Sequence, residues 1–112
     1  MGVYKVEDAL EELEELRGEL LSRAEERLKR RDYDGVANIL FAVDCEVKEL
    51  VREGRRLRLR GELDRKVYKV LVDGYFDIMS QLWSLTEKYG AKDEVRLLYL
   101  MRLDSLAQAR RR

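Results

Sequence analysis

The 112-residue sequence lacks histidine and proline and contains a single cysteine, Cys45. Without histidine, the chain lacks the usual general base near neutral pH and the commonest metal ligand in proteins. Ser-His-Asp and Cys-His catalytic groups, zinc sites and the Glu-x-x-His sites of di-iron helical bundles are therefore excluded. The seven glycines are dispersed and no Gly-Lys-Ser or Gly-Lys-Thr occurs, so a phosphate-binding loop is excluded as well.

Cysteine content and the length of apolar runs bear on where the protein resides. A single cysteine cannot form an internal disulfide, which fits a reducing cytosol. Cys45 lies in an apolar segment, where a thiol is typically a small buried side chain and not a reactive group. The apolar runs contain only a few residues, too few to span a membrane. We therefore expect a cytoplasmic protein that does not insert into membranes.

Charged residues are abundant and balanced, at 41% of the sequence with 23 of each sign. The apolar content of 46% is nevertheless that of a folded chain and not of a disordered one. High charge of both signs, without histidine or proline, is typical of the surface ion-pair networks of thermophilic proteins. We therefore predict a thermophilic source.

Helical periodicity dominates the chain, because apolar residues recur at steps of three and four over most of its length. The length suits one domain, residues 1–112. We expect an all-α fold, an up-and-down four-helix bundle with long helices that is completed by oligomerisation. The expected helices are about Val6–Arg30, about Val36–Glu53, about Glu62–Tyr89, and Asp93 to about Arg110.

Aspartate and glycine residues predict where these helices begin and end. Asp32 or Asp34 is expected to cap the second helix by accepting hydrogen bonds from free backbone amides. Gly54 and Gly90 are expected to end the second and third helices in the left-handed conformation that glycine tolerates. Asp93 is expected to cap the fourth helix.

Two features depart from simple helical periodicity. Gly18 interrupts the first helix at a cost near 1 kcal/mol, which predicts a close helix crossing at that position. In Arg55–Gly61, leucines alternate with arginines at a period of two, which is a strand pattern without a partner strand elsewhere. We interpret this segment as an extended connector or as an irregular first turn of the third helix.

The apolar stripes of the second, third and fourth helices are broader than a helix of an isolated bundle needs. Self-association as a symmetric homodimer accounts for this excess, and a tilted bundle that covers more of each helix is the alternative. Aromatic and methionine residues at helical spacing are more often core or interface than the lining of a ligand pocket. The candidate self-association or partner surface contains Tyr75, Met79, Trp83, Leu97, Tyr99 and Leu100.

Charge is divided unevenly along the chain. Residues 1–51 carry 14 acidic and 8 basic side chains, whereas residues 52–112 carry 9 acidic and 15 basic ones. The halves are expected to neutralise one another within the bundle or across a dimer. The basic segment 52–69 is a candidate nucleic-acid surface, although Tyr68 is the only aromatic residue near it and the pI is about 6.4. Its candidate polyanion contacts are Arg52, Arg55, Arg56, Arg58 and Arg60.

Carboxylates are the remaining candidates for chemistry. Glu46-Val47-Lys48-Glu49 resembles the Glu-x-x-Glu half of the MazG-like nucleotide pyrophosphohydrolases. Asp73 and Asp77, four residues apart, depart from the Glu-x-x-Asp spacing of that family's second half. The resemblance implies a Mg²⁺-dependent hydrolase with its metal between the second and third helices, if the four carboxylates converge.

Three functional hypotheses follow from the sequence. The first is a non-enzymatic helical module that requires no cofactor, self-associates and presents charged and apolar surfaces to a protein partner. The second is a nucleic-acid-associated accessory protein that uses the basic segment 52–69. The third is the MazG-like hydrolase. The first is favoured, because no catalytic or ligand-binding motif stands out from the helical pattern.

Overall fold

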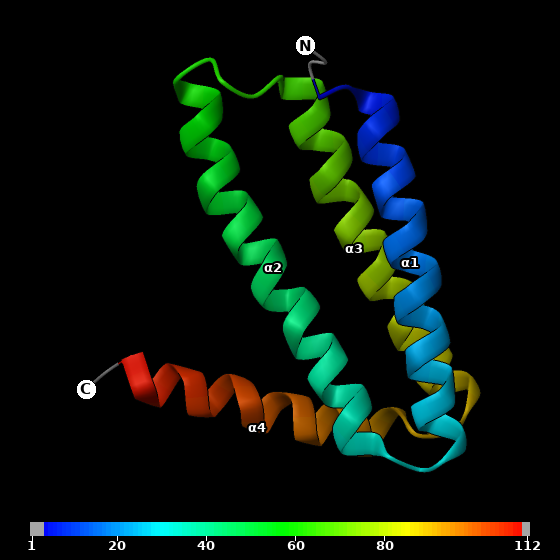
Figure 1. The fold of residues 1–112 in the computed structure, drawn as a ribbon. Coiled ribbons are helices and arrows are strands. Elements are labelled where there is room, and N and C mark those ends of the chain that lie inside the picture. The colour runs from blue at the N-terminus through cyan, green and yellow to red at the C-terminus, as the bar shows by residue number, and fades with distance from the viewer. Residues whose placement is uncertain (1–3, 111–112) are drawn as a thin grey trace.

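The computed structural model describes residues 4–110, and within them the chain forms four helices and no strands (Figure 1). The helices are α1 (Val6–Lys29), α2 (Tyr33–Leu59), α3 (Arg65–Lys88) and α4 (Lys92–Arg110). They pack against one another around one hydrophobic core, so the prediction of an all-α four-helix bundle is confirmed. In this range no helix combines the length and the apolar character needed to cross a membrane.

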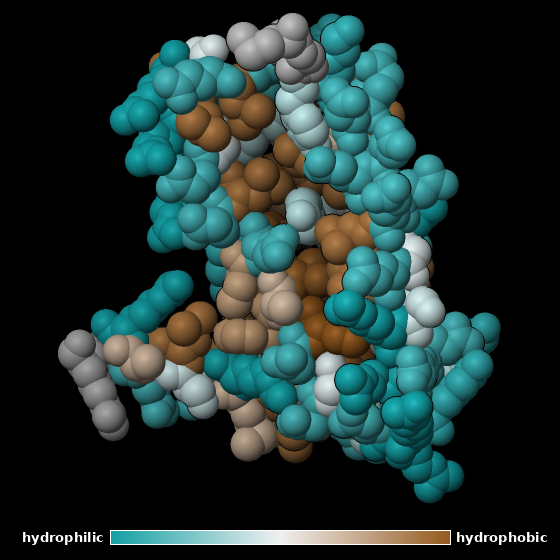
Figure 2. Space-filling model, in the orientation of Figure 1, coloured by the Kyte–Doolittle hydropathy of each residue, from teal (hydrophilic) through white to brown (hydrophobic). Residues whose placement is uncertain are grey.

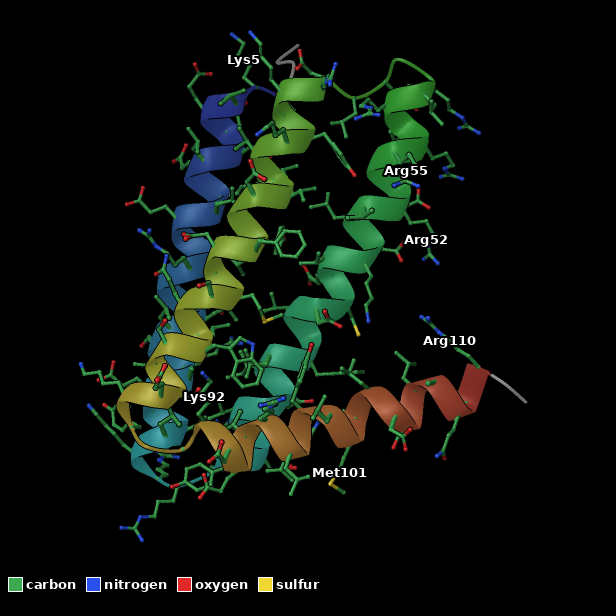
Figure 3. All side chains as sticks on the ribbon, turned by 180° about the vertical axis from the view of Figure 1, so that it is seen from behind. Lys5, Arg52, Arg55, Lys92, Met101 and Arg110 are labelled. Carbon is green, nitrogen blue, oxygen red and sulfur yellow. The ribbon has the colours of Figure 1, made fainter. Side chains whose placement is uncertain are left out.

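The fourth helix has an orientation of its own. The first three helices run up and down beside one another, with α3 packed closely on α1 (Figure 1). α4 lies across α2 near the α1–α2 turn and projects sideways beyond it (Figures 1 and 3). α4 packs mainly on α2, less on α3, and does not approach the backbone of α1 within the described residues. One side of α4 therefore faces away from the bundle.

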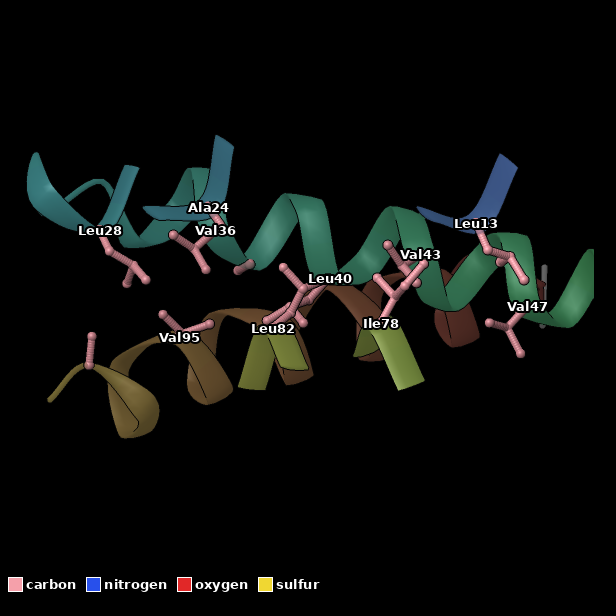
Figure 4. Close-up of a cluster of buried hydrophobic side chains, with 12 residues drawn as sticks. Leu13, Ala24, Leu28, Val36, Leu40, Val43, Val47, Ile78, Leu82 and Val95 are labelled. Atoms are coloured by element: carbon pink, nitrogen blue, oxygen red, sulfur yellow. The ribbon is translucent and has the colours of Figure 1, made fainter. Parts of the chain in front are cut away.

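The core lies where the helices converge, and all four contribute to it (Figure 4). Leu40, Ile78 and Leu82 are its largest fully buried side chains, and Val95 anchors α4 in the same cluster. Burial of each such side chain contributes about 1.5–3 kcal/mol to folding. These residues lie at the three- and four-residue spacings that predicted the helices.

Three of the residues that were expected to begin or end a helix are considered first, and Gly54 follows below. Asp32 caps α2, since its Oδ1 accepts a hydrogen bond from the Gly35 amide at 3.0 Å, and Gly90 ends α3 with φ +68°, so both predictions are confirmed. The prediction for Asp93 is wrong, because α4 already begins at Lys92 and Asp93 lies in its first turn. The buried Ala91 precedes α4, and an acidic residue in a first turn is favoured by the helix dipole without acting as a cap.

The end of α2 differs most from expectation. Gly54 does not end the helix, and Arg55–Gly61 is not an extended connector, because α2 continues to Leu59 and the left-handed residue is Gly61 at φ +73°. Arginine and leucine both favour helix, so a period-two alternation does not prevent one. The helix α3 then starts at Arg65, after the cap Asp64, and not at Glu62.

The close helix crossing also lies at a different glycine. Gly18 faces solvent, and a Cβ at this position would meet no atom within 4 Å, so the expected crossing at Gly18 is wrong. α1 and α3 are in close contact at Gly74, where a Cβ would overlap the side chain of Leu13. The packing role expected of Gly18 therefore belongs to Gly74, which Leu13 reaches from the other helix.

Candidate interaction surface

The six residues of the predicted surface fall into two groups. Leu97 and Leu100 are exposed, with 61% and 47% of their surfaces accessible. The other four are partly buried and pack against the core cluster, so most of their apolar surface is already covered within the chain. These four residues are Tyr75, Met79, Trp83 and Tyr99.

The exposed side of α4 forms a continuous apolar surface. Leu97, Leu100 and Met101 lie three and four residues apart, so they share one side of the helix. Met101 is 57% exposed and was not among the predicted surface residues, although its spacing from Leu97 could have placed it there. We call these three residues the α4 face. Figure 3 shows the Met101 side chain pointing away from the other helices.

Contacts on the opposite side hold α4 in place. The rings of Trp83 and Tyr99 pack edge to face with centroids 5.4 Å apart. Burial raises the pKa of the Tyr99 hydroxyl, and the nearby Asp44 carboxylate raises it further. The Arg102 guanidinium donates hydrogen bonds to the carboxylate of Asp34 at 2.8 Å and to its carbonyl oxygen at 3.2 Å. The α4 face is therefore carried by a helix that aromatic and ionic contacts position.

Two shallow hollows flank the α4 face. One, of about 240 Å³, lies beside Leu100 and is lined by the rings of Trp83 and Tyr99 together with Lys92 and Arg96. The other, of about 510 Å³, lies beside Met101 and is lined between α2 and α4 by apolar and polar side chains. A ridge between hollows is a shape into which the side chains of a packed helix can fit. The apolar side chains of the second hollow are Phe41, Leu98, Met101 and Leu106.

The chain exposes more surface than a compact monomer of its mass. Its accessible surface is 8095 Å², whereas a folded monomer of 13.3 kDa exposes about 6,450 Å². Its radius of gyration is 15.8 Å, against about 13 Å for a compact domain of this length. Figure 2 shows part of the excess, since apolar side chains remain visible in the trough between α1 and α2. The excess of about 1,600 Å² is twice the area of about 800 Å² that one partner buries in a standard interface.

A tyrosine links α3 to the carboxylates of α2 and α1. The Tyr75 hydroxyl donates a hydrogen bond to Glu46 at 3.2 Å. Burial raises the pKa of Tyr75 to about 12, with further contributions from Glu46 and from Glu12 of α1. Glu12 in turn accepts a hydrogen bond from the Tyr4 hydroxyl at 2.6 Å. Glu46 is thus engaged by a neighbouring helix as a hydrogen-bond acceptor.

The four candidate metal ligands are not brought together. Glu49 is paired with Arg52 on its own helix, Asp73 is 3.2 Å from Lys69, and Asp77 accepts a hydrogen bond from Gln81 at 2.7 Å. Across residues 4–110, no group of three or more carboxylate or cysteine side chains is arranged to hold a metal ion. The juxtaposition that the MazG resemblance requires is therefore not formed by Glu46, Glu49, Asp73 and Asp77.

The five candidate polyanion contacts are exposed in the second half of α2 and at its C-cap, Arg60, and Figure 3 labels Arg52 and Arg55 among them. Arg52 and Arg56 pair with Glu49 and Glu53 of the same helix. Arg58 lies over the ring of Tyr68, 5.5 Å from its centroid, while Arg55 and Arg60 form no ion pair in the part described. Because Arg58 covers one side of the ring and Gly54 packs against it, Tyr68 is not free to stack on a base.

Comparison with known proteins gives no family for this chain. No protein-family model matches it, and no curated protein or solved structure is significantly similar to it. Its function is therefore inferred from its own exposed surfaces and charges.

Proposed function

We propose that this chain is a non-enzymatic helical module that self-associates as a homodimer through the α4 face. The observation that carries the proposal is the exposure of Leu97, Leu100 and Met101 on one side of a helix whose other side is anchored. Contiguous exposed apolar side chains on a soluble domain mark interaction surfaces. A second copy offers the same ridge and hollows, which is what a two-fold symmetric interface requires.

The large accessible surface of the chain is consistent with a second copy as its partner. The excess of about 1,600 Å² over a compact monomer is distributed over the whole chain, and a dimer of standard size needs about 800 Å² from each copy. The parts of the Trp83 and Tyr99 rings that stay accessible line the hollow beside Leu100, and aromatic side chains are enriched among the residues that contribute most to binding energy. The sequence hypothesis of self-association thus has a specific surface to which it applies.

The experiment is a change of charge on the α4 face. Light scattering after size exclusion, in ~0.5 M salt to screen charge attraction, measures the mass of each variant. Wild type is expected at twice the chain mass of 13.3 kDa, and Leu97→Lys/Leu100→Lys at the chain mass. Leu59→Lys is the matched control, since Leu59 is 79% exposed at the other end of α2 and should leave the dimer intact.

Circular dichroism separates unfolding from dissociation. Both substituted leucines are exposed, so the double variant should keep the helical signal of the wild type while losing half its mass. A double variant that stays dimeric would show that α4 is not the interface. Loss of the dimer in the Leu59→Lys control would show that the effect is not specific to the α4 face.

The cytoplasm and a thermophilic source remain the setting we propose for this module. A single, partly buried thiol at Cys45 fits a reducing compartment. Surface ion pairs within helices, such as Arg23–Glu19 and Arg30–Glu26, fit the charge-rich surface of a thermophilic protein. Thermal unfolding of the purified chain tests the second point, because a transition in the range usual for mesophilic domains would count against it.

A further inference from the structure

Two oppositely charged surfaces lie at one end of the molecule. The acidic field covers the first half of α1, and the basic corner joins the end of α2 to the start of α3. None of their side chains forms an ion pair within residues 4–110. The acidic field consists of Glu7, Asp8, Glu11, Glu12, Glu14 and Glu15. The basic corner consists of Arg55, Arg58, Arg60, Arg65 and Lys66.

These two surfaces form no ion pair with each other within residues 4–110. The end of α2, which carries Arg55 and Arg58, lies on the edge of the molecule opposite α1, whereas the start of α3, which carries Arg65 and Lys66, lies beside α1 (Figures 1 and 3). The ion pairs that do form are local, within one helix or across one turn. In the described part, Arg102–Asp34 at 2.8 Å is the one ion pair that joins residues distant in the sequence, and it lies near α4. Direct pairing of the acidic first half with the basic second half is thus almost absent.

We propose that the acidic field of one copy docks on the basic corner of a second copy. The surfaces carry six and five charges of opposite sign and their side chains are exposed, so they are complementary between copies. Because the chain has no net charge, two copies approach without overall repulsion. Nucleic acid is the weaker occupant, because the acidic field at the same end repels phosphates and Tyr68 offers no free ring for stacking.

This contact is separate from the α4 face and does not depend on it. The α4 face lies at the end of the molecule opposite the two charged surfaces (Figures 1 and 3). A chain with two distinct self-association surfaces assembles beyond a dimer. The charged contact is screened by salt, whereas the apolar contact is not. Assembly beyond the dimer is therefore expected only at low ionic strength.

Sedimentation velocity of nuclease-treated protein tests the proposal at ~20 mM and ~500 mM salt. Wild type is expected to sediment at low salt as a species of about twice its high-salt mass or larger. Glu11→Lys/Glu14→Lys/Glu15→Lys and Arg55→Glu/Arg60→Glu/Arg65→Glu should each lose this growth when measured alone. Their equimolar mixture should recover it, because the unaltered basic corner of the first variant then meets the unaltered acidic field of the second. All six positions are exposed, and the second variant leaves Arg58 on Tyr68.

A charge reversal elsewhere provides the control. Lys29→Glu/Arg30→Glu/Lys88→Glu changes the net charge by as much as the arginine variant, at the opposite end of the bundle, and should keep the low-salt growth. A wild-type mass independent of salt, or a mixture that does not recover assembly, would overturn the proposal. So would salt-sensitive binding of added duplex RNA at the basic corner without self-assembly. A chain that is monomeric at high salt but assembles at low salt would instead contradict only the α4 proposal.

Discussion

The ring of Tyr68 on α3 lies against Gly54 on α2, in the space that a side chain at position 54 would fill. Its hydroxyl lies 3.5 Å from the carbonyl oxygen of Val51, and the Arg58 guanidinium covers the ring at 5.5 Å from its centroid. This contact joins the end of α2 to the start of α3, where the connecting turn leaves the two helices apart (Figure 1). It also positions Arg58 of the basic corner.

Replacement of Gly54 should therefore destabilise the fold. A Cβ at this position overlaps the Tyr68 ring, so Gly54→Ala forces the two helices apart and should cost about 1–3 kcal/mol. Urea unfolding followed by circular dichroism measures the free energy of unfolding. An unchanged or increased stability would show that the ring moves aside freely and that the contact does not hold α2 to α3.

Gly18→Ala is the matched comparison, and it should increase the free energy of unfolding where Gly54→Ala decreases it. A Cβ at Gly18 meets no atom within 4 Å, and alanine is favoured over glycine inside a helix by about 0.5–1 kcal/mol. The variant should thus unfold at higher urea concentration with the same slope. Destabilisation by Gly18→Ala would indicate that this side of α1 is covered, for example by a second copy.

These glycines show what local sequence could and could not predict. The helical spacing of apolar residues indicated the four helices and the core, because burial repeats with the period of the helix. In the sequence, Gly18, Gly54 and Gly74 are each a single glycine within a helical pattern. In the structure, Gly54 and Gly74 each contact a residue of another helix, whereas Gly18 contacts none. Leu13 and Tyr68 approach Gly74 and Gly54 only after the chain has folded, so tertiary contacts decide which glycine is a crossing and which is exposed.

The candidate surface was predictable to a similar extent. The width of its apolar stripe correctly indicated that α4 is apolar on more than one side. The stripe does not indicate which of those sides α2 covers. That depends on the crossing of α4 over α2, which sequence periodicity does not encode. As a result Trp83 and Tyr99 are partly buried against the core, whereas Met101 joins Leu97 and Leu100 on the exposed side.

Removal of the Arg102 guanidinium should loosen α4 from α2. Arg102 donates to Asp34 and to the carbonyl oxygen of Leu98, and only 24% of its side chain is accessible. Arg102→Met keeps the apolar stem and should cost about 1–2 kcal/mol in urea unfolding. Arg96→Met, an exposed change on the same helix, should stay within about 0.5 kcal/mol of wild type. Equal effects of the two would mean that the bond to Asp34 contributes nothing to docking.

Tyr75 should make stability sensitive to alkaline pH. Burial, Glu46 and Glu12 raise its pKa to about 12, above the value near 10 of an unfolded tyrosine. A raised pKa in the folded state stabilises the fold fully below pH ~10 and less as pH rises toward ~12. Between these pH values the melting temperature of wild type should fall more steeply than that of Tyr75→Phe. Lysine deprotonation is common to both proteins, so parallel curves would show that Tyr75 does not contribute.

Sedimentation equilibrium of the wild-type chain at micromolar concentration in ~0.5 M salt tests the central proposal most directly, because charged contacts are then screened and the α4 face acts alone. A homodimer through Leu97, Leu100 and Met101 predicts a mass of twice 13.3 kDa that returns to the chain mass in Leu97→Lys/Leu100→Lys. A wild-type mass of 13.3 kDa throughout this concentration range would contradict it.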